Sequence, residues 1–407
     1  MHTRLSRQTF LTGAAAVAGG IGLSKWPAAA SGTGTVTMPF ANGARTLATY
    51  PQKREMILLT SRPVQLETPF EVFNDGVFTP NDAFFVRWHL SGVPTTVDPQ
   101  AYRLNVHGHV TNPLSLTFDD LTKRFAPVEV NAVCECSGNS RGFFDPRVPG
   151  GQWGNGAMGN ATWRGARLKD ILTRAGIASG AVQVRFNGLD KPLLPQTPDF
   201  MKSLDRDVAN GDDVIVAYEM NGKPLPLLNG FPARLVVPGW FATYWVKMLD
   251  DIEVLAQPDD NFWMKTAYRV PAAPCGCQLP GTKVPTVPIT RLNVRSFITS
   301  VADGATVTTD DIRSVRGIAF DGGSGIANVQ FSSDGGATWK RALLGADSGK
   351  YSFREWTASF KPERGKQYSL QSIATAQDGS TQPATLAWNA SGYARNVIET
   401  VKITVSP

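Results

Sequence analysis

The chain has 407 residues, of which 42% are hydrophobic and 18% are charged, and its formal net charge is +6. Three of the basic residues, Arg4, Arg7 and Lys25, lie in an N-terminal segment without acids, so the remainder carries only +3. This length is enough for two to three domains. A nearly balanced charge without basic tracts argues against nucleic acid as a partner.

The first 30 residues have the composition of an export signal. Arg4 and Arg7 precede an apolar run rich in Ala and Gly, and Ala28–Ala30 offers small residues for cleavage. The apolar run is shorter than the ~20 residues that a membrane-spanning helix needs. We therefore expect cleavage near Ala30 and no stable membrane span, with an uncleaved anchor as the alternative. The stretch from Ser6 is similar to a twin-arginine signal with Gln8 in place of the second arginine, which predicts a periplasmic protein.

Residues 31–80 are mostly small and polar, and we expect an N-terminal extension that wraps the next domain without a core of its own. The run 81–90, NDAFFVRWHL, then predicts a strand. Side chains alternate along a strand, so Arg87 and His89 share one face. One such residue alone is usually a surface charge or a satisfied core group, but two on an aromatic strand indicate an anionic ligand.

A glycine-rich loop that contains Cys136 is the centre of the sequence. Residues 102–110 and 128–133 predict strands, and residues 117–124 predict a short helix with a capping start. The second strand leads to Cys136, and Arg141 and Arg147 follow. Positive charge favours the thiolate, which is the form that binds a soft metal. A buried structural cysteine beside a turn is the alternative.

The sequence of this region resembles the sulfite oxidase family of molybdopterin enzymes. The resemblance lies in CSGNSR from Cys136 to Arg141, followed by Trp153, GAMG, Trp163 and GARL. It is most similar to the exported bacterial sulfite dehydrogenases, from about residue 80 to the C-terminus. The resemblance implies that Cys136, rather than Cys134, gives the one protein thiolate to molybdenum, because the family's ligand directly precedes Ser/Ala-Gly-Asn. It also implies that Arg87 and His89 contact the pterin and the substrate pocket.

Two further segments continue this resemblance. Residues 168–175 predict a helix that ends near Gly176, and residues 182–186 predict a strand that leads to Gly-Leu-Asp190. Asp190 is either a turn residue or a pterin ligand. A strand at 215–218 precedes the segment 229–249. There the family pattern places Arg234 and Lys247 on the cofactor's phosphate, which requires charge-assisted donors.

Other residues of the second half complete the expected site. Asn229 replaces a histidine that the family often has, and it can still donate to a phosphate. Trp245 is a candidate cofactor contact, although Trp240, Tyr244 and Trp245 also suit a core. The resemblance makes Tyr268 the active-site tyrosine, whose hydroxyl donates to sulfite or to a metal oxo group.

The four cysteines form two Cys-x-Cys pairs, which do not resemble a disulfide framework. For Cys275 and Cys277, in a proline-rich linker, we expect a structural or interdomain role. No Cys-x-x-Cys-His occurs, so the chain carries no c-type haem. Electrons would therefore pass to a separate acceptor, for which we predict a c-type cytochrome.

Short alternating strands separated by Asp-Gly-Gly turns follow residue 289 and predict a β-sandwich. The predicted fold class is thus an α+β molybdopterin-binding domain, of the kind found in sulfite oxidases, followed by an all-β immunoglobulin-like sandwich. The expected organisation is an export signal at 1–30, an extension at 31–80, a catalytic domain at 81–280 and a dimerisation domain at 285–407. A homodimer or a heterodimer with a haem subunit is expected.

The predicted function is oxidation of sulfite to sulfate at a molybdenum–molybdopterin centre, with Arg87 and Arg141 binding the anion. The alternatives are a periplasmic molybdopterin sulfoxide reductase and a non-enzymatic exported binding module. One departure concerns the C-terminal domain, where animal relatives place an arginine in a Trp-Asn-x-Arg pattern and this chain has Ser391. We predict that Arg395 fills that role, with an ordinary surface arginine as the alternative.

Overall fold

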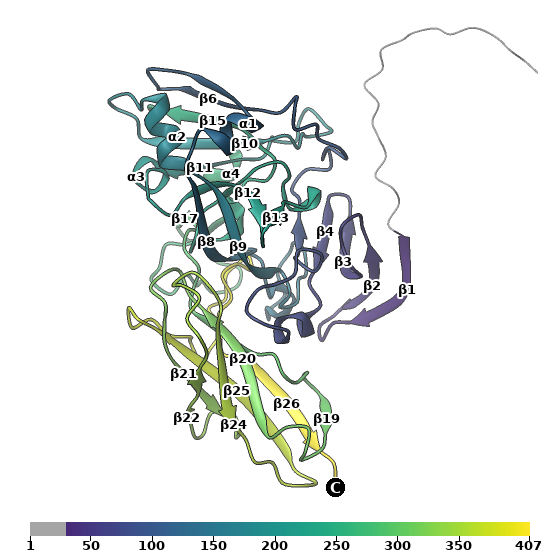
Figure 1. The fold of residues 1–407 in the computed structure, drawn as a ribbon. Coiled ribbons are helices and arrows are strands. Elements are labelled where there is room, and N and C mark those ends of the chain that lie inside the picture. Colours follow the sequence, from purple (N-terminus) through teal and green to yellow (C-terminus); the bar gives the residue numbers. More distant parts are fainter. Residues whose placement is uncertain (1–29) are drawn as a thin grey trace, which may run out of the picture.

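The computed structural model describes residues 30–407, and the expected export signal lies outside this range. Figure 1 shows three parts: a small N-terminal sheet, a mixed α/β domain, and a β-sandwich at the opposite end of the molecule. No helix in the described range is long and apolar enough to cross a membrane.

The N-terminal part is a five-stranded antiparallel sheet. In spatial order its strands are β1 (Ala30–Thr37), β2 (Ala44–Thr49), β3 (Met56–Ser61), β4 (Val64–Glu67) and β5 (Val86–Arg87). The buried side chains of Met56, Leu66 and Trp88 form a small core with Leu228 and Met248 of the central domain. The extension thus forms a sheet without a separate core, because its buried side chains pack in one cluster with residues of the central domain.

The predicted strand at 81–90 is reduced to Val86–Arg87 in the structure. Residues 80–83 form a turn, in which Ala83 N donates to Pro80 O (3.0 Å), and the chain becomes extended only after this turn. Arg87 pairs with Gln65 of β4, so the N-terminal sheet holds the residues that precede His89.

The central domain contains two sheets and short helices. The first sheet has the order β11 (Met201–Asp205), β10 (Gln183–Gly188), β15 (Leu249–Leu255), β6 (Arg103–Gly108) and β7 (Leu114–Thr117), with β15 and β6 parallel. The second has the order β13 (Lys223–Pro224), β12 (Ile215–Met220), β9 (Met158–Arg167) and β8 (Pro127–Glu135), and β14 (Arg234–Val236) pairs with β12. The helices are α1 (Phe118–Lys123), α2 (Leu168–Ala175), α3 (Arg206–Ala209) and α4 (Phe262–Lys265), and the 3₁₀ helices are η1 (Phe70–Asn74), η2 (Arg141–Phe143), η3 (Leu227–Asn229) and η4 (Ala242–Tyr244).

Both longer helices begin and end as their sequences predict. Thr117 caps α1 in a reciprocal capping box with Asp120. Helix α2 ends at Gly176, which adopts φ +68°, a left-handed conformation that glycine tolerates. Strand β8 pairs with β9 along its whole length, up to the pair of Glu135 with Met158, so the loop that begins at Cys136 starts from a fixed strand end.

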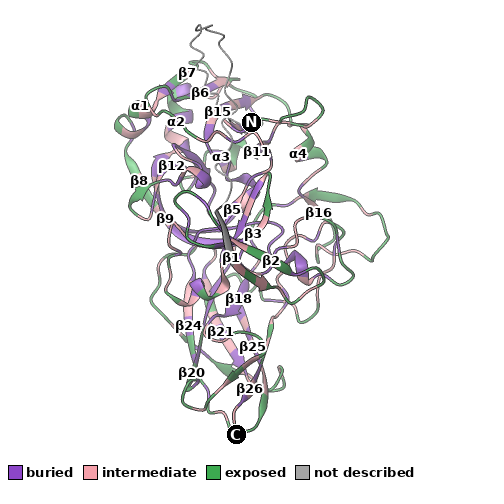
Figure 2. Ribbon diagram, turned by 90° about the vertical axis from the view of Figure 1, so that its right-hand side faces the viewer, coloured by how far each residue is buried: buried purple, intermediate pink, exposed green. Residues whose placement is uncertain are grey.

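The C-terminal part is a sandwich of two sheets. One has the order β18 (Arg295–Ile298), β20 (Ser314–Phe320), β24 (Arg354–Ser359) and β23 (Leu343–Leu344), and the other has the order β19 (Ala305–Val307), β26 (Thr400–Val405), β25 (Gln367–Ala376), β21 (Ile326–Ser332) and β22 (Lys340–Arg341). Buried side chains such as Val329, Trp356 and Leu370 form one core cluster of this sandwich. Figure 2 shows buried residues along its strands. The predicted fold class is thereby confirmed.

The linker between the domains contains a hairpin and a disulfide. Strands β16 (Arg269–Pro271) and β17 (Thr286–Pro288) pair, and the loop between them carries a disulfide that joins Cys275 to Cys277. The second Cys-x-Cys pair is thus a disulfide, since two cysteines separated by one glycine can fold back on each other. This agrees with the structural role expected for Cys275 and Cys277, but we did not expect the pair to be a disulfide. Cys134 and Cys136 remain free thiols.

Candidate active site

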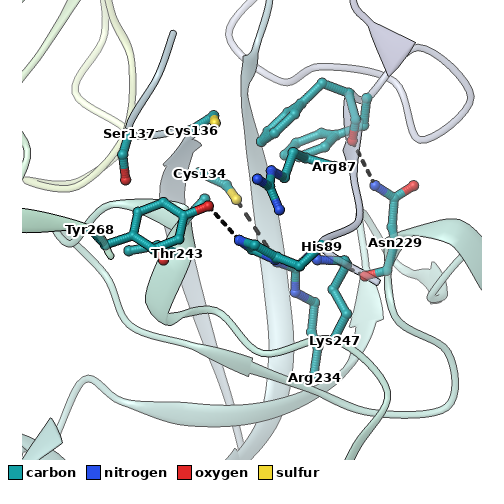
Figure 3. Close-up of a pocket in the computed structure, with 13 residues that line it drawn as sticks. Arg87, His89, Cys134, Cys136, Ser137, Asn229, Arg234, Thr243, Lys247 and Tyr268 are labelled. Carbon is teal, nitrogen blue, oxygen red and sulfur yellow. Dashed lines mark hydrogen bonds between the residues drawn. The ribbon is translucent and has the colours of Figure 1, made fainter. Parts of the chain in front are cut away.

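A cavity lies where the N-terminal sheet, the loop after β8 and the segment before β15 meet (Figure 3). Its lining residues are Phe84, Phe85, Arg87, His89, Cys134, Cys136, Ser137, Asn229, Arg234, Ala242, Thr243, Lys247 and Tyr268. Residues from positions 84 to 268 therefore converge on one space, and seven of the predicted site residues are among them.

The cavity is cationic. Arg87, Arg234 and Lys247 line it, whereas none of its lining residues is an Asp or a Glu. Burial, reinforced by the charge of Arg234, lowers the pKa of Lys247 to about 7. Burying positive groups close together costs free energy, which indicates that the cavity is built for an anion.

Four buried polar atoms of the lining have no partner in the protein. They are Arg87 Nη1, Ser137 Oγ, Arg234 Nε and Thr243 Oγ1. Buried polar groups are nearly always hydrogen-bonded, so a group of orphans around one cavity indicates a polar ligand. Gly230 keeps space between two of the cations, because a Cβ there would lie 3.1 Å from the Cβ atoms of Arg234 and Lys247.

The two free thiols differ in their surroundings. Burial raises the pKa of the Cys134 thiol to about 11, and Arg234 Nη2 lies 3.9 Å from its sulfur. Cys136 is 7% exposed, compared with 1% for Cys134, and it follows directly on the end of β8. Arg147 does not face the thiols: it is exposed and donates to Ala41 O (2.7 Å), contrary to the prediction that it favours a thiolate.

His89 and Tyr268 face each other across the cavity. His89 Nε2 and the Tyr268 hydroxyl share a short hydrogen bond, and the imidazole stacks on Phe200 with ring centres 3.5 Å apart. Burial lowers the pKa of His89 well below its usual value, and the neighbouring Arg87 lowers it further, so the imidazole is neutral. Burial raises the pKa of Tyr268, which keeps its hydroxyl protonated.

Arg141 lies beside the cavity but does not line it. Nε donates to Ser391 O (3.1 Å), and Nη1 donates to Gly151 O (3.1 Å). A Cβ at Gly138 would lie 2.5 Å from Arg141 Nη2, so the loop requires glycine there. The charge of Arg141 still reaches the Tyr268 hydroxyl, whose pKa it lowers against the larger effect of burial.

Asn229 lines the cavity, but its side chain is engaged on both sides. Nδ2 donates to Phe85 O (3.0 Å), and Oδ1 accepts from Lys53 Nζ (2.5 Å). Lys53 also donates to Phe84 O (2.8 Å), so this lysine, which lies in the loop between β2 and β3, braces the cavity wall. Lys53 was missed because nothing in its local sequence indicates a contact 176 positions along the chain.

Besides Arg141, three predicted residues do not line the cavity. Asp190 is buried, and its charge acts on Lys247, with burial raising the pKa of the carboxyl. Trp245 is a core residue whose Nε1 donates to Trp240 O (3.0 Å), while Arg234 lies over its ring. Arg395 lies elsewhere: it forms a short ion pair with Glu399 and packs over Phe143. This placement contradicts the expectation that Arg395 completes the pocket.

Tyr393, rather than Arg395, brings the C-terminal domain to the site. Its ring stacks on that of Tyr268, with ring centres 5.4 Å apart and an angle of 8° between the planes. The guanidinium of Arg141 also lies over the Tyr393 ring, 5.0 Å from the ring centre. The charges of Arg141 and Arg87 lower its pKa, while burial raises it more strongly. Tyr393 is two residues beyond the position at which the arginine was sought, so attention to charge alone missed it.

Comparisons with known proteins agree with this arrangement. Residues 89–263 match the family described as "Oxidoreductase molybdopterin binding domain", and residues 286–406 match "Mo-co oxidoreductase dimerisation domain". The chain is 34% identical over 367 residues to mitochondrial sulfite oxidase of Mus musculus, covering 86% of this chain and 65% of the mouse protein. It is 34% identical over 348 residues to sulfite oxidase of Gallus gallus, covering 82% of this chain and 74% of the chicken protein.

A solved structure extends the likeness to bacteria. The crystal structure of the sulfane dehydrogenase SoxCD from Paracoccus pantotrophus aligns with a TM-score of 0.71 and 26% identity, covering 84% of each chain. The likeness therefore includes both the central domain and the sandwich.

Proposed function

Because the chain belongs to the sulfite oxidase family of molybdopterin enzymes, we propose that it oxidises sulfite to sulfate in the periplasm. The observation that carries the proposal is the cationic cavity with four unpaired buried polar atoms and a free thiol in its wall. The chain spans 65% of the mouse enzyme, so its own activity and partners are part of the proposal.

The residues of the cavity fit the molybdopterin cofactor. The Arg234 Nε atom and Lys247 suit its phosphate, as a charge-assisted N–H donor and a compact charge respectively. Arg87 and Thr243 offer further donors to the pterin, and Cys136 offers the thiolate that molybdenum requires. The bound cofactor supplies oxygen transfer and two-electron redox chemistry, whereas the protein supplies orientation and charge.

The remaining side chains act on the substrate. Conversion of sulfite and water to sulfate releases two electrons and two protons. Arg87 and Arg141 provide the positive field that attracts the dianion. The Tyr268 hydroxyl donates a hydrogen bond to a substrate oxygen, and the neutral His89 imidazole holds that hydroxyl in place.

The electrons require an acceptor, and we propose a separate c-type cytochrome. The absence of a Cys-x-x-Cys-His motif from the 407 residues supports this. Export through the twin-arginine route, suggested by residues 6–11, would carry a folded protein with its cofactor to the periplasm. The sandwich domain supports a dimer, because its family is described by dimerisation.

Oxidation of sulfane sulfur is a second candidate. The likeness to the Paracoccus sulfane dehydrogenase supports it, as does the placement of Arg395 outside the cavity, which leaves the substrate side with less charge than expected. A pocket with fewer positive groups suits a larger anion whose negative charge is spread over more atoms than that of sulfite, such as thiosulfate.

One experiment separates these functions. The chain is produced in a host that makes molybdopterin, and molybdenum per chain is measured together with reduction of cytochrome c by sulfite and by thiosulfate. Methionine sulfoxide with a reduced dye tests the sulfoxide reductase alternative. Stoichiometric molybdenum with sulfite-dependent reduction supports the proposal, preference for thiosulfate supports the second candidate, and a purified chain without molybdenum contradicts both.

A further inference from the structure

A buried charge network connects the sandwich domain to the loop that carries Cys136. Arg295, the first residue of β18, is 3% exposed in its side chain, and Glu135, the last residue of β8, is 1% exposed. Arg295 Nη1 donates to Glu135 Oε1 (2.6 Å). Glu135 directly precedes Cys136, so the ion pair holds the residue next to the thiol.

The same guanidinium makes two more contacts. Arg295 Nη2 donates to Ser140 Oγ (2.8 Å) in the loop and lies 3.4 Å from Glu399 Oε1 of its own domain. Glu399 in turn pairs with Arg395. One arginine thus reaches both ends of residues 135–140, and the opposite charges within the network balance each other.

Backbone contacts from the sandwich domain hold the same loop at other points. Ala394 N donates to Ser137 O (3.0 Å), and Arg141 Nε donates to Ser391 O (3.1 Å). Within the central domain, Asn139 Nδ2 donates to Glu135 Oε1 (3.0 Å), so Arg295 and the loop itself converge on one carboxylate oxygen. The loop is therefore built between two domains, and its shape depends on both.

We propose that Arg295 is a positioning residue that sets the orientation of Cys136 through Glu135 and Ser140. The sandwich domain then shapes the metal-ligand loop in addition to any role in dimerisation. This inference rests on the proposed function only in taking Cys136 as the ligand of the metal. Outer contacts of metal ligands typically change affinity or activity by about 10- to 100-fold when they are removed.

The test compares Arg295→Met with Arg354→Met in the full chain. Arg354 is an arginine of the same domain that pairs with Asp347 (3.0 Å) rather than with residues 135–141, so it controls for general loosening of the sandwich. In chain purified from a host without molybdopterin, alkylation of Cys136 by iodoacetamide is followed by peptide mass spectrometry. We expect Arg295→Met to speed it about ten-fold, because local opening of the loop becomes easier, while Arg354→Met leaves it unchanged.

In chain purified with the cofactor, molybdenum per chain, the Mo(V) electron paramagnetic resonance spectrum and steady-state kinetics are measured. We expect Arg295→Met to lower molybdenum content or kcat by about ten-fold, to alter the spectrum, and to leave KM within about two-fold. If the wild-type chain does not oxidise sulfite, the proposed function is refuted. The alkylation and molybdenum measurements would still show whether Arg295 positions Cys136.

Loss of one partner from a buried ion pair is strongly destabilising, so Arg295→Lys provides a second variant. Lysine keeps the charge beside Glu135 but cannot span Glu135, Ser140 and Glu399 at once. We expect it to fold and to alkylate at Cys136 several-fold faster than wild type. A folded Arg295 variant with wild-type alkylation, molybdenum content and spectrum would overturn the inference.

Discussion

Replacement of Arg234 by Met removes the central cation of the cavity. Arg234 is 3% exposed, and its Nη1 and Nη2 already donate to Asn229 O (2.9 Å) and Trp245 O (3.3 Å). Nε is buried without a partner, so we expect it to donate to an anionic group of the cofactor. A charge-assisted hydrogen bond contributes about 1.5–3 kcal/mol, and its loss should weaken cofactor binding by about 10- to 150-fold.

The cofactor-free protein should respond in the opposite sense. Burial lowers the pKa of Lys247, and the charge of Arg234 lowers it further, so removal of Arg234 relieves repulsion within the cavity. Two carbonyl groups lose their donors at the same time, which offsets part of this gain. The thermal shift between cofactor-free and loaded chain should therefore shrink by several degrees in Arg234→Met.

The assay measures molybdenum per chain after dialysis and the melting temperatures of both forms. Arg164→Met is the matched control, because Arg164 pairs with Glu219 (3.0 Å) in the same domain and does not line the cavity. Full molybdenum content together with a wild-type thermal shift in Arg234→Met would refute the assignment of this residue to the cofactor.

Three further predictions follow from individual contacts. Cys136→Ser should abolish molybdenum-dependent turnover, whereas Cys134→Ser should retain most of it, because a hydroxyl is a poor ligand for a metal that prefers thiolate; the reverse pattern with molybdenum retained would exchange the two assignments. Arg395→Met should leave the sulfite KM and its salt dependence unchanged, since Arg395 pairs with Glu399 and does not line the cavity. Loss of this pair should lower the free energy of unfolding by about 1–3 kcal/mol. A ten-fold rise in the sulfite KM would show instead that Arg395 contacts the substrate. Burial lowers the pKa of Lys202 to about 7, while an unfolded chain keeps it near 10.4. The unfolded state therefore binds more protons between these pH values, so the free energy of unfolding should rise from pH 7 to pH 9, by about 1–2 kcal/mol more in wild type than in Lys202→Met. Equal pH dependence of the melting curves of the two proteins would contradict this.

Local sequence was sufficient where a structure depends on neighbouring residues. The capping box at Thr117, the helix end at Gly176 and the strand that leads to Cys136 all depend on contacts within a few positions. Arg87, His89, Arg234 and Lys247 could be assigned because the resemblance to the family supplied the long-range arrangement, and all four line the cavity.

Sequence was insufficient where distant segments meet. Lys53 reaches Asn229 from the loop between β2 and β3, and Tyr393 reaches Tyr268 from the C-terminal domain. Neither contact leaves a periodic or compositional signal near the residue. Arg395 was misplaced for the related reason that a charge near the expected position does not determine its direction, and Glu399, four positions further along, provides a nearer partner.

The charge network around Arg295 and the cationic cavity have opposite construction, and this difference separates their roles. The network of Arg295, Glu135, Arg395 and Glu399 contains two acids and two bases, so its formal charges balance within the chain and its ion pairs can fix geometry without a ligand. The cavity lining contains three cations and no carboxylate, and the nearby Asp190 offsets only part of their charge, so a bound anion improves the charge balance. The first cluster should therefore hold the Cys136 loop in shape before the cofactor arrives, whereas the second converts cofactor binding into stability, because an anion that neutralises buried cations binds the folded chain and not the unfolded one.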